Sequence, residues 1–150
     1  MKRPDFMAQA FAEAEAAAER GEVPIGAVIV RGTDIVARAG NRTRELNDAT
    51  AHAEILAIRE ASTKLGQERL TGLDLYVTLE PCTMCAAAIA FARLRRLYFG
   101  AADDKGGAVV SGVRFYASPT CHHAPDVYAG IGETRAAEIL KGFFKDRRED

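Results

Sequence analysis

Two short segments carry potential metal ligands, and they must meet in space if these residues are to act together. The first, "TAHAEILAI", contains His52 and Glu54, and the second, "LEPCTMCAAAI", contains Cys82 and Cys85. On a helix, residues three apart lie on one face, so both cysteine sulfurs would point the same way. Pro81 is tolerated in the first turn of a helix, because its missing N–H would have no partner there. We therefore expect a pocket over the N-termini of two adjacent helices.

The ligand types in these segments favour a catalytic metal site over a structural one. His52, Cys82 and Cys85 supply three ligands, and no fourth appears at a familiar spacing. Structural zinc sites use four protein ligands, whereas catalytic sites keep one position open for water. The helix dipole favours the thiolate form that binds metal. We expect Glu54 to accept a proton from that water. A thioredoxin-like redox pair is disfavoured, because the flanking elements differ and the His-Glu pair would have no role.

Hydrophobic periodicity predicts strands alternating with helices after an initial hairpin. Such an order predicts an α/β fold in three layers (α/β/α), with a mixed five-stranded sheet covered on both faces. The second helix has Ile55, Ile58 and Leu65 on one side. Residues 106–125 show no clear pattern. The expected helices are 5–20, 51–65, 81–92 and a C-terminal helix that includes 136–143, and the expected strands are 23–30, 35–39, 75–79, 95–101 and 126–131.

Composition limits the kinds of protein that this chain can form. Its 150 residues, 48% hydrophobic, suit one domain spanning 1–150. No apolar run reaches the roughly 18 residues of a spanning helix, so we expect no membrane partner. Acidic residues interrupt the alanine-rich start, which argues against a signal peptide and for a cytoplasmic location. Three cysteines, an odd number, argue against a full disulfide framework.

The charge pattern excludes extensive nucleic-acid wrapping but leaves a small RNA footprint open. The formal net charge is −1, far from the basic balance of proteins that wrap long nucleic acids. Basic residues nevertheless gather at positions 42–44, 93–96 and 141–148. Each cluster is interpretable either as a solvated surface or as a local RNA contact.

The paired segments match a known signature. "HAE" followed by "PCTMC" resembles the H-x-E…P-C-x-x-C pattern of zinc-dependent nucleobase deaminases. Longer strings, from Glu22 to Ala108 and again in the last helix, resemble the bacterial tRNA-specific adenosine deaminases. These strings are "EVPIGAVIV", "NRTRELNDATAHAEILAIREA", "LYVTLEPCTMCAAAI" and "YFGAADDKGGA".

The resemblance implies a cytidine-deaminase-like fold, a homodimer, one Zn²⁺ per chain and conversion of adenosine to inosine at the wobble position of a tRNA anticodon stem-loop. It implies that His52, Cys82 and Cys85 bind zinc and that Glu54 shuttles protons. Substrate contacts carried over from the family are Asn41 to the flipped base, Asp103 and Lys105 beside the substrate strand, and Phe144, Arg147 and Arg148 at the anticodon loop.

The sequence departs from the family pattern in two places. Gly106 stands where many members have Thr, and the stretch "VVSGVRFYASPTCHHAPDVY" is unusual. Within it, Cys121, His122 and His123 are interpreted as a surface loop in preference to a second metal site.

Two alternative functions remain. One is a deaminase of a free base or nucleoside, such as guanine, cytosine or cytidine, with the same zinc chemistry. The other is a non-catalytic RNA-binding module that keeps zinc for stability. Glu54 argues against the second, because a structural zinc site needs no carboxylate beside an open position.

Overall fold

The sheet of this chain is built from five strands in the order β2-β1-β3-β4-β5. The computed structural model describes residues 5–149, with side chains described for residues 5–145. Strand β1 runs antiparallel to β2 and β3, whereas β3, β4 and β5 are parallel to one another. The mixed sheet expected from the sequence is therefore confirmed. The strands are β1 (Gly26–Arg31), β2 (Asp34–Gly40), β3 (Asp74–Leu79), β4 (Arg96–Ala101) and β5 (Asp126–Tyr128).

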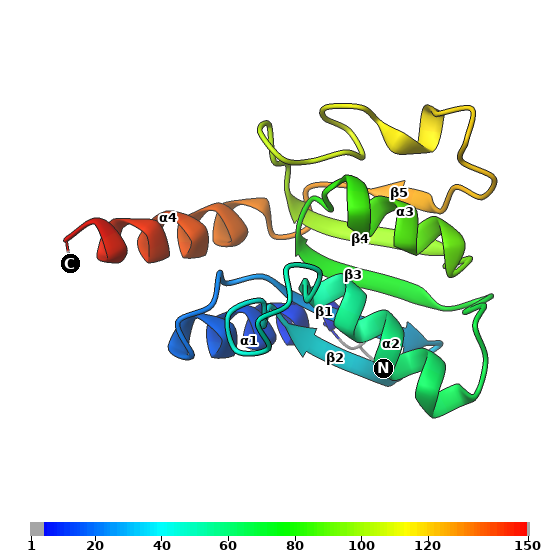
Figure 1. Cartoon of the computed structure of the whole chain (residues 1–150), viewed down its shortest axis with the longest axis horizontal. Helices are drawn as coiled ribbons and strands as arrows, with labels where there is room; N and C mark the ends of the chain where they lie inside the picture. The colour runs from blue at the N-terminus through cyan, green and yellow to red at the C-terminus, as the bar shows by residue number, and fades with distance from the viewer. Residues whose placement is uncertain (1–4, 150) are drawn as a thin grey trace.

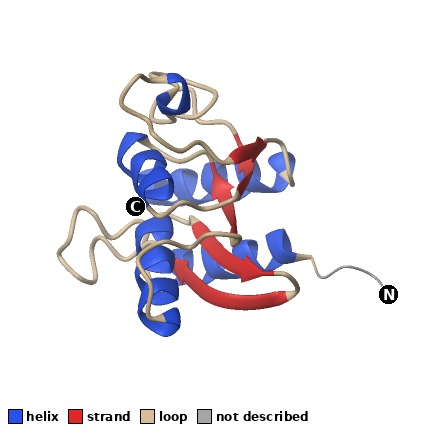
Figure 2. Cartoon of the chain, turned by 90° about the vertical axis from the view of Figure 1, so that its right-hand side faces the viewer, coloured by secondary structure: helices blue, strands red, loops and turns tan. Residues whose placement is uncertain are grey.

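Helices cover both faces of this sheet, giving the three expected layers (Figures 1 and 2). One face packs against α1 (Phe6–Glu19) and the start of α4 (Glu133–Glu149), through a cluster that includes Val28, Val30 and Ala136. The opposite face packs against α2 (Ala53–Leu65) and α3 (Thr83–Phe91) in a larger cluster. In Figure 1 the C-terminal part of α4 extends away from the sheet.

Small residues let the helices approach the sheet closely. Ala10 and Ala14 of α1 are fully buried. A Cβ added at Gly26 of β1 would clash with the main-chain oxygen of Ala10. Asp5 caps α1, its carboxylate accepting a 3.0 Å hydrogen bond from Ala8 N. This cap agrees with the start of the helix expected from the sequence.

Both helices that carry the potential ligands begin two residues later than the sequence predicts. His52 and Cys82 are the N-cap residues of α2 and α3, with extended backbones (φ/ψ −74°/154° and −73°/176°). Neither side chain forms a hydrogen bond that caps its own helix, so both are available to point away from their helices and toward each other. Helix α2 also turns its alanines to the sheet, and the expected Ile58–Leu65 face is only partly buried.

The parallel strands β3 and β4 place the loops that follow them at the same edge of the sheet. Strand β3 ends at Leu79 and leads through Glu80 and Pro81 into α3, and β4 ends at Ala101 and leads into an irregular segment. The carboxyl ends of neighbouring parallel strands open into a common crevice, where ligands of α/β proteins commonly bind. A short 3₁₀ turn, η1 (Phe115–Ala117), is the only regular element in the described part of residues 102–125.

Candidate active site

His52, Cys82 and Cys85 lie together where the N-termini of α2 and α3 meet. The Nδ1 atom of His52 is 3.6 Å from the Cys82 sulfur and 3.5 Å from the Cys85 sulfur. The potential ligand atoms of all three residues lie within 4.8 Å of one another. Segments separated by 30 residues thus converge on one point.

The spacing of these atoms fits a tetrahedral zinc ion. With Zn–S of about 2.3 Å and Zn–N of about 2.0–2.1 Å, tetrahedral geometry separates nitrogen from sulfur by about 3.6 Å. The two measured separations, 3.5 and 3.6 Å, agree with this value. Two sulfurs and one imidazole nitrogen are also the donor types that zinc prefers. The chain's own residues therefore fit a metal with one position left for another ligand.

The two cysteines differ in their readiness to ionise. Hydrogen bonding from Cys85, together with His52, lowers the pKa of the Cys82 thiol to about 4. The pKa of Cys85 is raised far above its usual value, because its proton is held by Cys82 and because it is buried. Of the two thiols, Cys82 therefore ionises more readily, and Cys85 retains its proton. Metal binding would displace the remaining proton, as it does at thiolate sites in general.

Glu54 lies in the first turn of α2, beside this cluster and out of water. Its side chain is only 4% exposed. Burial raises the pKa of Glu54 to about 7, although a bond from its own backbone and the charge of His52 oppose the rise. A carboxyl group with this pKa exchanges protons readily near neutral pH. Among the buried carboxylates of the described residues, Glu54 is the one whose charge acts on His52 and Cys85.

Asn41 lies under the start of α2, where it holds the helix that carries His52 and Glu54. Its Oδ1 accepts a 2.8 Å hydrogen bond from Ala53 N, the first residue of the helix. Its own N–H donates to Ile25 O at 3.1 Å. With Oδ1 committed to the helix, the amide Nδ2 remains as the group that Asn41 can offer to a ligand.

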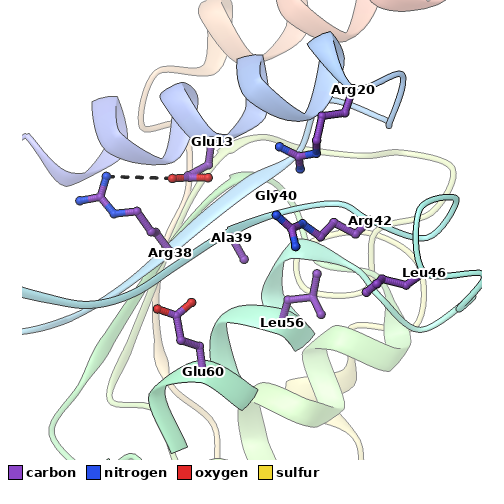
Figure 3. Close-up of a pocket in the computed structure, with 9 residues that line it drawn as sticks. All are labelled: Glu13, Arg20, Arg38, Ala39, Gly40, Arg42, Leu46, Leu56 and Glu60. Atoms are coloured by element: carbon purple, nitrogen blue, oxygen red, sulfur yellow. Dashed lines mark ion pairs between the residues drawn. The ribbon is translucent and has the colours of Figure 1, made fainter. Parts of the chain in front are cut away.

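Arginine and glutamate side chains line a hollow of about 270 Å³ between α1, β2 and α2 (Figure 3). Arg20 points into it and donates a 3.3 Å hydrogen bond to Asn41 O. Arg38 reaches Glu13 at 4.0 Å across the same hollow. Arg20 thus holds the main chain of Asn41 through its carbonyl oxygen, a contact that no sequence pattern indicates.

Three of the residues assigned to substrate contacts share one groove. Asp103, Lys105 and Phe144 line a hollow of about 580 Å³ with apolar residues of the segment before β1 and of β3, β4 and α4. Asp103 Oδ1 also accepts hydrogen bonds from Lys105 N and Gly106 N, which fixes the turn they form. The side chains of the other two assigned residues, Arg147 and Arg148, lie outside the described residues.

The unusual segment holds its cysteine and histidines apart from the His-Cys-Cys cluster. His123 Nε2 lies 2.8 Å from Leu94 O, and the Cys121 thiol donates to His123 O at 3.2 Å. Among the described residues, only His52, Cys82 and Cys85 form a group of three or more potential metal ligands. The interpretation of 121–123 as a surface loop agrees with this arrangement.

Two further residues close to the site escaped sequence reasoning. Glu80, immediately before Pro81, is 2% exposed and accepts hydrogen bonds from the segment that carries Asp103. Tyr116 donates a 3.0 Å hydrogen bond to Ala86 O in α3. Its pKa is raised, first by burial and then by the nearby Cys121 and Glu54. The motif "Glu-Pro-Cys" drew attention to the position of Glu80, but nothing in the sequence predicted its hydrogen-bond donors in the segment that carries Asp103.

A mixed α/β sheet with a His-Cys-Cys cluster and a buried glutamate at two helix N-termini is the architecture of hydrolytic nucleobase deaminases. The model of the MafB19-like deaminase family matches residues 1–148. A curated tRNA-specific adenosine deaminase of Agrobacterium fabrum is 67% identical over 149 residues, covering 99% of this chain and 98% of the relative.

Solved structures agree with this placement. One, from a study of A-to-I editing by tRNA:A34 deaminases, is 70% identical, with a TM-score of 0.89 over 90% of this chain and 98% of that chain. A guanine deaminase of Bacillus subtilis is 39% identical, with a TM-score of 0.65 over 68% of this chain and 66% of that chain. The chain belongs to the tRNA-specific adenosine deaminases, within the MafB19-like deaminase family.

This membership decides between an enzyme and a binding module. The family and fold are those of hydrolytic deaminases, so the alternative of a non-catalytic RNA-binding protein is set aside. A separate observation concerns membranes: none of the helices in the described part of the chain combines the length and hydrophobicity needed to cross a bilayer.

Proposed function

We propose that this enzyme hydrolyses the wobble adenosine of a tRNA anticodon to inosine, releasing ammonia. The observation that carries the proposal is the His52, Cys82 and Cys85 cluster with Glu54 buried beside it. The relatives named for tRNA adenosine deamination cover nearly the whole chain, which supports this substrate over a free base.

We assign one Zn²⁺ per chain to the three ligands, with His52 binding through Nδ1, the nitrogen that faces both sulfurs. When bound, zinc lowers the pKa of a water molecule at its open position. Glu54 accepts a proton from water, donates one to N1 of adenine and assists the departure of ammonia from C6. Burial suits Glu54 to this work, since it holds the pKa of the carboxyl near 7.

We assign recognition of the RNA to Asn41 and to the groove of about 580 Å³ described above. Asn41 would donate from Nδ2 to an acceptor of the flipped base, since its Oδ1 is occupied by Ala53 N. Asp103, Lys105 and Phe144 line the groove where neighbouring nucleotides would lie. Arg147 and Arg148 would add phosphate contacts at the end of α4. Stacking and a few basic contacts suit a single-stranded RNA loop and agree with the net charge of −1.

The test is inosine formation by the zinc-loaded protein. Substrates are an anticodon stem-loop with adenosine at the wobble position, the same loop with that adenosine moved, and free guanine, cytosine, cytidine and adenosine. We expect inosine only at the wobble position. Turnover of a free base with the stem-loop untouched would retain the zinc chemistry but refute the tRNA substrate.

We further propose that the chain is a single domain, works in the cytoplasm and forms a homodimer. The match to a relative over 99% of the chain supports one domain, and three free cysteines suit a reducing compartment. Phe91 and Val113 are 74% and 67% exposed, which makes them candidates for burial in such an interface. Sedimentation of the Phe91→Ser variant tests the dimer: we expect a monomer, and an unchanged dimer would exclude Phe91 from the interface.

A further inference from the structure

Glu80 is a buried carboxylate that makes five hydrogen bonds, and every donor comes from one loop. Its Oε1 accepts from Asp103 N and the Ser111 hydroxyl, both at 2.9 Å. Its Oε2 accepts from Val109, Val110 and Ser111 N at 2.8–2.9 Å. Three successive amides around one oxygen form an anion-binding nest, occupied here by a side chain of the protein itself.

The loop, residues 102–111, is shaped around this carboxylate. Gly107 packs so closely that an added Cβ would overlap the carboxyl carbon of Glu80. Asp103 is held at its main chain by Glu80, and its own side chain then fixes Lys105 N and Gly106 N. Glu80 therefore determines where the turn at residues 103–106 lies.

That turn borders the groove assigned above to RNA. Asp103 and Lys105 line the groove of about 580 Å³ together with Leu79, the residue before Glu80. Two residues after Glu80, the metal ligand Cys82 is held instead by the first turn of α3, where Ala86 N donates to Cys82 O at 2.8 Å. The carboxylate thus bonds to the recognition loop and not to the His-Cys-Cys cluster.

We propose that Glu80 is a positioning residue for RNA binding: its carboxylate fixes the segment at Asp103 and Lys105 against the substrate and so sets the affinity for the RNA. The inference rests on the proposed tRNA substrate. It assigns to the glutamate of "Glu-Pro-Cys" a role in recognition that is separate from the role of the neighbouring metal ligands.

The Glu80→Gln variant disturbs this arrangement at a defined point. If the Gln oxygen occupies the site of the three amides, its NH₂ group must face Asp103 N–H, another donor. Ser111 can rotate its hydroxyl to accept, but the main-chain amide of Asp103 cannot. The first part of the loop to move is therefore the part that faces the groove.

The experiment measures KM and kcat for stem-loop deamination, zinc content, and hydrogen exchange of the loop amides. For Glu80→Gln we expect KM to rise about tenfold, kcat to stay within about twofold and zinc to stay at the wild-type level, which is the pattern of lost binding without lost chemistry. The amides of residues 103–111 should exchange faster. The matched control is Asp74→Asn, a 5% exposed carboxyl that pairs with Arg95 at the opposite end of β3. It should lower the melting temperature and leave KM unchanged.

A second variant approaches the contact from the loop. Gly107→Ala keeps the carboxylate but displaces it, and we expect the same rise in KM. An unchanged KM in folded Gly107→Ala or Glu80→Gln, with the loop amides exchanging faster, would overturn the inference. So would an equal loss of kcat and zinc. Wild-type protein in the same assay tests the proposed function separately, and hydrogen exchange reports on the loop whether or not the RNA is edited.

Discussion

The side chain of Asn41 has two roles, capping α2 through Oδ1 and offering Nδ2 to the substrate, and two substitutions can separate these roles. Its Oδ1 caps α2 through Ala53 N at 2.8 Å, while His52, the N-cap residue, supplies no cap bond of its own. Asn41 is 5% exposed, so water cannot replace the lost bond. Removing a cap costs about 1 kcal/mol, and leaving a buried N–H unpaired costs about 1–3 kcal/mol.

Asn41→Ala should therefore lower the free energy of unfolding by about 1–2 kcal/mol. For a domain of this size, that corresponds to a fall of roughly 2–8 °C in melting temperature. Asn41→Asp keeps an oxygen acceptor in the same place, and Asp is among the best residues for a helix N-terminus. We expect it to recover most of the stability. Thermal unfolding of both variants, in the metal-free and zinc-loaded forms, measures this difference.

Activity should depend on the Nδ2 group of Asn41, which is the other polar group of its side chain. Both variants lack the Nδ2 donor, so kcat/KM for the stem-loop should fall about tenfold or more in each, as expected for about 1.4 kcal/mol of lost binding. If Asn41→Asp melts as low as Asn41→Ala, the capping argument is wrong. If Asn41→Asp keeps wild-type kcat/KM, Nδ2 does not contact the base.

Four further outcomes are expected. Glu54→Gln should lower kcat by roughly 10²–10⁴ with zinc content unchanged, measured by inosine formation and metal analysis. Zinc removal by a chelator should abolish turnover, and zinc restoration should return it, with proton release from Cys85 detectable by calorimetry in buffers of different ionisation enthalpy. Deletion of residues 143–150 should weaken stem-loop binding and lower the melting temperature only slightly, because Ala136 is the buried residue of α4 among those whose side chains are described, and Phe143 is half-buried. Gly26→Ala should destabilise the fold by roughly 1–3 kcal/mol in denaturant unfolding, since its methyl group would meet the backbone of α1.

The order of elements and the composition of the cluster could be predicted because each has a local signal. The hydrophobic periodicity that distinguishes strands from helices is visible within a few neighbouring residues, and Cys82 and Cys85 lie one helical turn apart. His52 could be joined to them because "HAE" and "PCTMC" together match the deaminase signature, whereas Cys121, His122 and His123 were interpreted as a surface loop.

Long-range polar contacts could not be predicted in the same way. Glu22 is buried and accepts hydrogen bonds from Arg44 N and Glu45 N, and Glu80 does the same for another loop. Such bonds join side chains to main-chain N–H groups, which every residue type except proline possesses, so the sequence of the loop does not indicate them. The face of α2 was missed for a different reason: alanines approach the sheet more closely than the larger Ile58, and hydrophobicity alone ranks them in the opposite order.

The way in which the loop at 102–111 and helix α4 are attached to the fold affects how the sequence of such an enzyme can change in evolution. The cluster is built on the ends of two helices that pack into the core, whereas residues 102–106 form a mostly exposed turn ahead of the buried Ala108 and Val109, and the C-terminal part of α4 extends away from the sheet (Figure 1). The sequence and length of residues 102–106 can therefore drift, provided that the loop still surrounds the carboxylate of Glu80. Exchanging this loop between relatives would transplant a preference for one nucleic acid onto an unaltered reaction centre. Reactivity and target choice would then be inherited as separate modules.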